Sequence, residues 1–225
     1  MKKGKRIYLA GDSTVQTYET KDIPQAGWGQ YIAKYFGQEV EFVNHAIGGR
    51  SSKTFVTEGR LDAVLNMLQG LDYLLIQMGH NDAAADKPER WTDAFTTYKE
   101  YLKKYINGAR NRGAVPVLIT PVATLHFKNG TFVNDFPDYC QAMTQVAKEE
   151  RVELIDLMNS SLRFYSSLGY EKAAQLFMGS INGTDWTHFT ESGANQIARL
   201  VALGVKELES GISSYVKAER SVIDY

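Results

Sequence analysis

The chain has 225 residues, of which 44% are hydrophobic and 23% are charged, and its formal net charge is -1. This composition is typical of a soluble globular protein, and the length suits one domain with a substantial core. The balanced charge gives no reason to expect binding to nucleic acid or to a membrane surface. The single cysteine, Cys140, cannot form an intramolecular disulfide.

The beginning of the chain bears on its location. The first six residues are rich in lysine and arginine, but the apolar stretch behind them, 7–10, is too short for the hydrophobic region of a signal peptide. No stretch of the sequence approaches transmembrane length. We therefore expect a cytoplasmic protein.

Strand-like and helix-like segments alternate along the chain. Residues 6–10 read as a first strand, and residues 28–36 follow with the apolar spacing of a helix. The remaining expected elements are, in order, a strand at 40–43, a helix at 60–69, a strand at 73–78, a helix at 91–112, a strand at 115–120, a helix at 137–150, a strand at 152–156, and a last helix that Thr190 caps and that runs to about 209.

This alternation predicts a three-layer α/β/α sandwich with a five-stranded parallel sheet. The sequence contains no internal repeat, linker or low-complexity segment, so we expect a single domain over 1–225. Its core is expected at about 5–210. The tail, 211–225, has weak periodicity and is expected to form a short helix or an arm.

Glycines and polar residues are concentrated directly after the predicted strands. Gly11-Asp12-Ser13-Thr14 follows the first strand, residues 44–52 follow the second, and residues 79–82 follow the third. A further polar loop, 184–188, precedes the last helix. Because the carboxyl ends of parallel strands share one edge of the sheet, where open α/β proteins place their sites, we expect these four loops to meet.

The residues of these loops suit acyl transfer. Ser13 can act as the nucleophile once a base takes its proton, and His188 can be that base. Asp185, three residues before His188, can hold the imidazole in the right tautomer and stabilise its positive charge. The backbone N–H groups of Ser13 and Gly49 and the side-chain amide of Asn81 are candidate donors to the oxyanion of a tetrahedral intermediate.

The same blocks match a known family. Gly11-Asp12-Ser13, the glycine of the second loop, Gly79-x-Asn81-Asp82 and Asp185-x-x-His188 resemble, in order, the four blocks of the SGNH (GDSL) hydrolases. The strings YLAGDST at 8–14, AIGGRSS at 46–52 and TFVN at 131–134 are similar to the rhamnogalacturonan acetylesterase branch.

The resemblance implies a flavodoxin-like SGNH hydrolase fold and a triad of Ser13, His188 and Asp185. It also implies an oxyanion hole completed by Gly49 and Asn81, with Gly48 as the competing choice for the glycine, and it implies no metal and no organic cofactor. A different serine-hydrolase architecture is disfavoured, because no Gly-x-Ser-x-Gly elbow occurs in the sequence.

By resemblance, the expected activity is that of a serine esterase that removes O-acetyl groups from carbohydrate through an acetyl-enzyme intermediate. The expected partner is a small acetylated oligosaccharide from rhamnogalacturonan (pectin). Bacterial members without a signal peptide act inside the cell on imported pectin fragments. The alternatives are esterases of other acetylated saccharides such as xylan fragments, a metal-dependent phosphoesterase, and a binding module that has lost catalysis. Against the phosphoesterase, no Asp-x-His pair follows the first strand.

Three further residues are candidates for contact with substrate. His126 lies in a long loop after the fourth strand and is expected to form a wall of the cleft. Trp186 lies between Asp185 and His188 and is expected to line the pocket. Arg50 either pairs with a carboxylate of galacturonate or pins the glycine loop, and pinning is the favoured interpretation. Other polar groups near the site are interpreted as scaffold: His45, His80 and Asp82.

Overall fold

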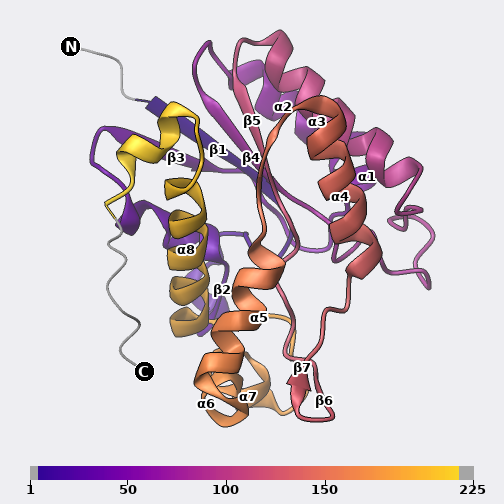
Figure 1. Cartoon of the computed structure of the whole chain (residues 1–225), viewed down its shortest axis with the longest axis vertical. Helices are drawn as coiled ribbons and strands as arrows, with labels where there is room; N and C mark the ends of the chain where they lie inside the picture. The colour runs from indigo at the N-terminus through magenta and orange to yellow at the C-terminus, as the bar shows by residue number, and fades with distance from the viewer. Residues whose placement is uncertain (1–4, 218–225) are drawn as a thin grey trace.

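The structure is a computed structural model, and it describes residues 5–217 (Figure 1). Five strands form a parallel sheet in the order β3-β1-β4-β5-β8. Their bounds are Lys5–Gly11 for β1, Val40–Asn44 for β3, Tyr73–Gln77 for β4, Val115–Ile119 for β5 and Glu153–Ile155 for β8. The predicted five-stranded parallel sheet is therefore confirmed.

Helices cover both faces of this sheet, which makes three layers (Figure 1). One face packs against α1 (Ser52–Thr57), α2 (Arg60–Met67), α3 (Thr97–Asn111) and α4 (Pro137–Glu150). The other packs against α5 (Leu157–Leu168) and α8 (Glu191–Lys206). Successive side chains of a strand point to opposite faces, so Ile7 joins one apolar cluster and Tyr8 the other. All five residues of β4 are buried, as expected for a central parallel strand.

The segment expected to be one helix at 28–36 forms two short 3-10 helices instead, η2 (Trp28–Gln30) and η3 (Ile32–Tyr35). The backbone N–H of Trp28 donates to Thr14 and that of Gly29 donates to Val15, so the segment is tied to the turn after β1. A Cβ at Gly29 would lie 2.3 Å from the carbonyl oxygen of Val15. This close approach sets the path of the backbone and prevents a regular α-helix from forming.

The helix expected at 91–112 begins later, at Thr97. The carboxylate of Asp93 accepts hydrogen bonds from the backbone of Phe95 and Thr96, which forms a turn ahead of the helix. The backbone N–H of Thr92 donates to the carbonyl oxygen of Asp82. The Asp93 turn and the bond from Thr92 to Asp82 thus take up backbone groups ahead of Thr97, so the helix starts six residues later than expected.

Smaller elements complete the chain. Those in the first part are η1 (Thr20–Asp22) and β2 (Gln25–Ala26). In the later part, a hairpin of β6 (Phe127–Lys128) and β7 (Thr131–Phe132) lies with α6 (Tyr170–Ala174) and α7 (Gly179–Asn182) at the lower end of Figure 1. A two-residue strand, β9 (Phe189–Thr190), pairs with β2.

In the C-terminal part, the described residues form the helix cap and the short tail helix that the sequence predicts. The hydroxyl of Thr190 accepts a hydrogen bond from the backbone of Gly193, which confirms the predicted cap of α8. A 3-10 helix, η4 (Gly211–Tyr215), lies in the tail, and the rest of the predicted tail, 218–225, is outside the described residues. None of the helices within 5–217 combines the length and the apolar character needed to cross a membrane.

The strand order places the loops that carry the polar blocks. The chain passes from β1 to the neighbouring β3 and then crosses back to β4 on the other side of β1, so the order reverses between β1 and β4. At such a reversal the loops after the two strands diverge and leave a crevice. The Ser13 turn follows β1 and the Asn81 loop follows β4, so both lie at this position.

Candidate active site

Ser13, His188 and Asp185 are joined by hydrogen bonds, although Ser13 and His188 are 175 positions apart in the chain. His188 Nε2 lies 2.8 Å from Ser13 Oγ, and His188 Nδ1 lies 2.8 Å from Asp185 Oδ2. A carboxylate only accepts hydrogen bonds, so Nδ1 carries the hydrogen, and in neutral His188 the free Nε2 accepts from the serine hydroxyl. This is the arrangement that a general base needs.

The spacing of Asp185 and His188 is explained by the local backbone. Asp185 Oδ1 accepts hydrogen bonds from the backbone N–H groups of Thr187 and His188, while Oδ2 contacts the imidazole. Burial acts to raise the pKa of Asp185, but the hydrogen bonds and the charge of His188 outweigh it, so this pKa is lowered. The carboxylate therefore stays ionised beside the imidazole.

The position of His188 is set by the residue that follows it. Phe189 is fully buried and pairs with Ala26 in the small β2–β9 ladder. On the other side, the backbone of Met178 donates to the carbonyl oxygen of His188. The imidazole is thus attached to a segment that is anchored in the core, and it projects toward the turn after β1.

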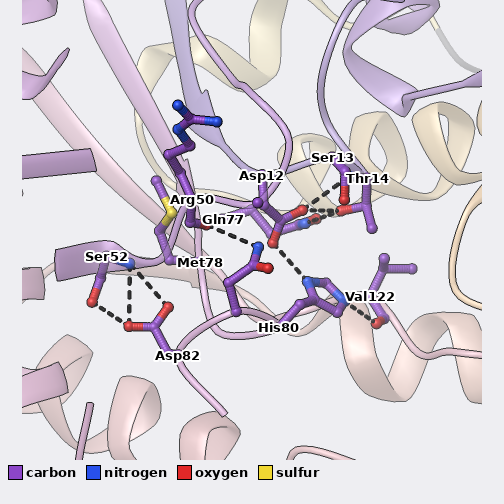
Figure 2. A network of polar contacts seen from close by, with 12 residues as sticks. Asp12, Ser13, Thr14, Arg50, Ser52, Gln77, Met78, His80, Asp82 and Val122 are labelled. Carbon is purple, nitrogen blue, oxygen red and sulfur yellow. Dashed lines mark hydrogen bonds and ion pairs between the residues drawn. The ribbon is translucent and has the colours of Figure 1, made fainter. Parts of the chain in front are cut away.

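A buried chain of hydrogen bonds shapes the turn that carries Ser13 (Figure 2). Asp12 Oδ1 accepts from both the backbone and the hydroxyl of Thr14. Gln77 donates to the Thr14 hydroxyl, and the indole of Trp28 donates to Gln77. Each of these polar side chains is buried, so each bond is protected from water, and the turn around Ser13 has one well-defined conformation.

His80 completes this network from the loop after β4. Its Nδ1 lies 2.8 Å from Asp12 Oδ2, and its Nε2 lies 2.9 Å from the carbonyl oxygen of Val122 (Figure 2). Both neighbours are acceptors, so both ring nitrogens carry hydrogens and the imidazole is positively charged. Burial acts to lower the pKa of His80, but the charge of Asp12 and the two hydrogen bonds raise it above its ordinary value.

The pKa of Asp12, the carboxylate that contacts His80, is shifted in the opposite direction. Burial acts to raise the pKa of Asp12, but the charge and hydrogen bond of His80 and the hydrogen bonds from Thr14 lower it. The side chain of Asp12 is 0% exposed and that of His80 is 7% exposed, so the two form a buried ion pair. Because Asp12 precedes Ser13 and His80 precedes Asn81, this pair connects the two loops.

Three groups are candidate donors to an oxyanion at Ser13. The backbone N–H groups of Ser13 and Gly49 have no hydrogen-bond partner among residues 5–217. Asn81 Nδ2 donates to the carbonyl oxygen of Arg50, which leaves its second hydrogen free. The N–H of Gly48 instead donates to the side chain of Gln16. This difference favours Gly49 over Gly48 as the glycine that donates to an oxyanion.

Asp82, beyond Asn81, fixes the loop to α1. Its carboxylate accepts hydrogen bonds from the backbone and hydroxyl of Ser52 (Figure 2). It also accepts one from the hydroxyl of Thr92. Burial raises the pKa of Asp82 to about 6, although these hydrogen bonds oppose the shift. The hydroxyl of Tyr139 donates to the Asp82 carbonyl oxygen and holds the backbone as well.

The comparison with known proteins follows from this geometry. A sequence profile described as GDSL-like Lipase/Acylhydrolase matches residues 7–201. The chain belongs to the GDSL-like lipase/acylhydrolase family. This membership confirms the resemblance to the SGNH (GDSL) hydrolases, and with the named relatives it confirms the prediction of a carboxylic ester hydrolase.

Two relatives of this GDSL-like hydrolase cover nearly the whole chain. It is 56% identical over 214 residues to the probable rhamnogalacturonan acetylesterase YesY of Bacillus subtilis, covering 95% of this chain and 98% of that protein. It is 40% identical to the rhamnogalacturonan acetylesterase RhgT of the same organism, covering 92% of both.

Solved structures show the same fold. The protein YxiM of Bacillus subtilis has a TM-score of 0.81 and 29% identity, covering 90% of this chain and 56% of that one. The acetylxylan esterase Axe2 of Geobacillus stearothermophilus has a TM-score of 0.66 and 14% identity, covering 91% and 96%. At this low identity, the likeness to Axe2 concerns the fold alone.

The three residues predicted to contact substrate differ in how far their side chains are engaged within the protein. Arg50 donates to the carbonyl oxygen of Gly48 and to the carboxylate of Glu58, so its charge is already paired. The ring of Trp186 packs over Gly179, where a Cβ would lie 2.3 Å from the indole, and it is partly buried against the core. His126 is exposed by 44% and contacts Asp135.

The histidine interpreted as scaffold after β3 lies apart from the hydrogen-bond network. His45 stacks on Tyr8 with ring centroids 6.2 Å apart, and burial lowers the pKa of His45.

Within 5–217, no group of three or more His, Cys, Asp or Glu side chains is arranged to hold a metal ion. Cys140 is partly buried, and burial raises the pKa of its thiol to about 12, so it remains protonated.

Sequence reasoning missed three residues that hold the site. Tyr18 donates to the carbonyl oxygen of Ser13, Gln16 accepts from Gly48, and Gln77 donates to Thr14. For Gln77 a signal was available, because it is the one polar residue in an otherwise apolar central strand. A buried glutamine needs partners for its amide, and its place near the end of β4 points to the turn after β1.

Proposed function

We propose that this protein is a serine esterase that removes O-acetyl groups from small rhamnogalacturonan oligosaccharides in the cytoplasm. The names of YesY and RhgT and their identity over nearly the whole chain support this substrate. The observation that carries the mechanism is the 2.8 Å contact between Ser13 Oγ and His188 Nε2, with Asp185 on the opposite nitrogen. No other arrangement of residues described above offers an activated nucleophile.

In the proposed mechanism, Ser13 Oγ attacks the acetyl carbonyl carbon while His188 Nε2 takes the hydroxyl proton. Asp185 stabilises the resulting imidazolium. The negative oxygen of the tetrahedral intermediate accepts hydrogen bonds from the N–H groups of Ser13 and Gly49 and from Asn81. When the intermediate collapses, the sugar oxygen leaves with the proton from His188, and Ser13 carries the acetyl group.

Water then completes the cycle. His188 removes a proton from a water molecule, which attacks the acetyl carbonyl of the acyl-enzyme and forms a second tetrahedral intermediate. Collapse breaks the bond to Ser13 Oγ, which regains its proton from His188. The products are acetate and the deacetylated sugar, and the protein groups return to their starting state.

The alternatives have less support. An esterase of acetylated xylan fragments would rest on Axe2, and that likeness extends only to the fold. A metal-dependent phosphoesterase would use these same loops for metal ligands, whereas Asp12 and His80 are engaged with each other in a buried pair. A binding module without catalysis would not need Ser13, His188 and Asp185 in hydrogen-bonding register.

The test is acetate release from acetylated rhamnogalacturonan oligosaccharides, acetylated xylan oligosaccharides and a synthetic acetyl ester. We expect preference for the pectic fragments and loss of all three activities in Ser13→Ala. The matched control is Ser214→Ala, since Ser214 is exposed in η4 and its hydroxyl contacts only its own turn. Circular dichroism checks that both variants fold. Retention of more than a few per cent of activity in Ser13→Ala contradicts the mechanism, and activity on the synthetic ester alone contradicts the pectic substrate.

A further inference from the structure

One arginine beside the proposed active site, Arg90, has no carboxylate partner in the part of the chain that the structure describes. Arg90 lies in the loop between β4 and α3, and its Nη1 donates to the carbonyl oxygen of Gly49 at 3.4 Å. No carboxylate oxygen among residues 5–217 lies within 4.0 Å of its guanidinium. Its Nε is buried and has no hydrogen-bond partner in the same part of the chain. Arg90 therefore presents an unpaired positive charge at the glycine loop.

The position of this charge relative to Ser13 is set by the two glycines. A Cβ at Gly48 would lie 3.4 Å from the Cβ of Ser13, so the glycine loop packs directly on the serine. A Cβ at Gly49 would lie 3.6 Å from Arg90 Nη1. The loop thus has Ser13 on one side and the guanidinium on the other. A group bound to Arg90 would thus be separated from Ser13 by the width of this loop, as a neighbouring sugar of the same oligosaccharide would be.

The surrounding charges favour an anion. Lys53 donates to the carbonyl oxygen of Pro88 in the same loop and has no carboxylate within 4.0 Å among the described residues. Arg50 and Arg60 share the single carboxylate of Glu58. Two of the acidic side chains of this loop, Asp86 and Glu89, are exposed and make no ion pair with Arg90 or Lys53 among the described residues. Arg90 and Lys53 thus offer two cationic groups at the glycine loop that have no carboxylate partner among the described residues.

We propose that Arg90 binds the carboxylate of a uronic acid residue in the substrate and makes the enzyme selective for anionic oligosaccharides. This inference rests on the proposed function, and it deepens it by naming the group that recognises the acid sugar. Arg50 is the residue that the sequence suggested for this role, but its guanidinium is engaged with Gly48 and Glu58. The planar guanidinium of Arg90 can form paired hydrogen bonds with a carboxylate through its two terminal nitrogens, Nη1 and Nη2.

The experiment compares Arg90→Gln with the wild type on three acetyl esters. The first is an acetylated galacturonate-containing oligosaccharide, the second is the same compound with its carboxyl groups methyl-esterified, and the third is a neutral synthetic acetyl ester. We expect kcat/KM to fall about 10- to 100-fold on the first substrate, because a hydrogen-bonded charge pair is lost. On the two neutral substrates, we expect a change of less than about twofold.

The neutral substrates separate recognition from support of the glycine loop. If Arg90 only holds Gly49 in place, the variant loses activity on all three esters equally, and the proposal is overturned. An unchanged kcat/KM on the acidic substrate also overturns it. Arg90→Lys keeps the charge without the planar fork, and we expect it to recover part of the loss. The matched control is Arg112→Gln, since Arg112 contacts Asn66 at the opposite edge of the sheet.

A second readout does not depend on pectic substrates being hydrolysed. Unacetylated digalacturonate is tested as a competitive inhibitor of the synthetic ester reaction, with its dimethyl ester as the neutral counterpart. We expect inhibition by the acid in the wild type, about 10- to 100-fold weaker inhibition in Arg90→Gln, and weakening as salt is added. Wild-type enzyme that hydrolyses only the synthetic ester refutes the proposed substrate, whereas equal inhibition of both proteins by the acid refutes the role of Arg90.

Discussion

The buried pair of Asp12 and His80 leads to a prediction of large magnitude. Replacing Asp12 with alanine removes the one carboxylate that contacts His80 within residues 5–217 and leaves an imidazolium that is 7% exposed without its counter-charge. Removing one partner of a buried ion pair typically costs about 3–5 kcal/mol. We expect the free energy of unfolding of Asp12→Ala to fall by this amount at pH 5.

Asparagine at the same position is expected to be much less damaging. Its oxygen can accept from Thr14 and its amide can donate to His80 Nδ1, provided that His80 becomes neutral and keeps its hydrogen on Nε2 for Val122. The network then loses a charge but no hydrogen bond, so we expect Asp12→Asn to cost about 1 kcal/mol. The difference between the two variants isolates the effect of the unpaired charge.

The pH dependence has a defined sign. The folded-state pKa of His80 is raised, so its contribution is fully present below the ordinary value of 6.5 and is lost as pH rises through the folded pKa. The folded-state pKa of Asp12 is lowered, so its contribution is fully present above the ordinary value of 3.8 and is lost as pH falls through the folded pKa. The free energy of unfolding of the wild type should therefore exceed that of Asp12→Ala by the largest amount between pH 3.8 and pH 6.5.

Urea unfolding from pH 4 to pH 9, followed by tryptophan fluorescence, measures these differences. The m-value must be unchanged for the comparison to hold. A loss of less than about 1 kcal/mol for Asp12→Ala at pH 5, or a loss that is greater at pH 9 than at pH 5, would refute the reasoning. Such a result would show that His80 is neutral in the folded protein.

Two further predictions concern the reaction. Asn81→Ala should reduce kcat about 100- to 1000-fold with little change in KM, because a donor to the transition-state oxyanion is lost. Steady-state kinetics on the synthetic ester test this prediction. An unchanged kcat excludes Asn81 from that role. Asp185→Asn should retain at least about tenfold more activity than His188→Ala, because the base survives without the group that orients it. Equal loss in both variants, measured on the same ester, would contradict that ranking.

Much of the architecture could be predicted from the sequence because its signals are local. The five central strands are recognisable as short apolar runs. Between them, apolar residues at helical spacing predict α2 and α4. The Asp-x-x-His spacing is also local, since the carboxylate of Asp185 accepts from the backbone N–H of His188 itself. The catalytic assignment of Ser13, Asp185 and His188 remains a prediction, but their proximity follows from placing these loops at one edge of a parallel sheet.

Where local signals competed with distant contacts, the prediction was wrong. The apolar spacing over 28–36 is that of a helix, yet Trp28 and Gly29 donate their backbone hydrogens to the turn that carries Ser13. The start of α3 was displaced in the same way, because Thr92 donates to the loop after β4. In both segments, backbone groups that would begin a helix hold a loop of the candidate site instead.

The sequence by itself determined the strand pattern, the identity of the reactive groups and the edge of the sheet at which they meet, because these depend on residue type and short-range spacing. Only the tertiary structure decided which of them pair. Gln16 accepts from the N–H of Gly48, whereas that of Gly49 has no partner among residues 5–217. Glu58 engages Arg50, while Arg90 has no carboxylate partner within the same residues. Each outcome depends on distances between side chains remote in the chain, and such distances exist only once the sheet and its loops have formed.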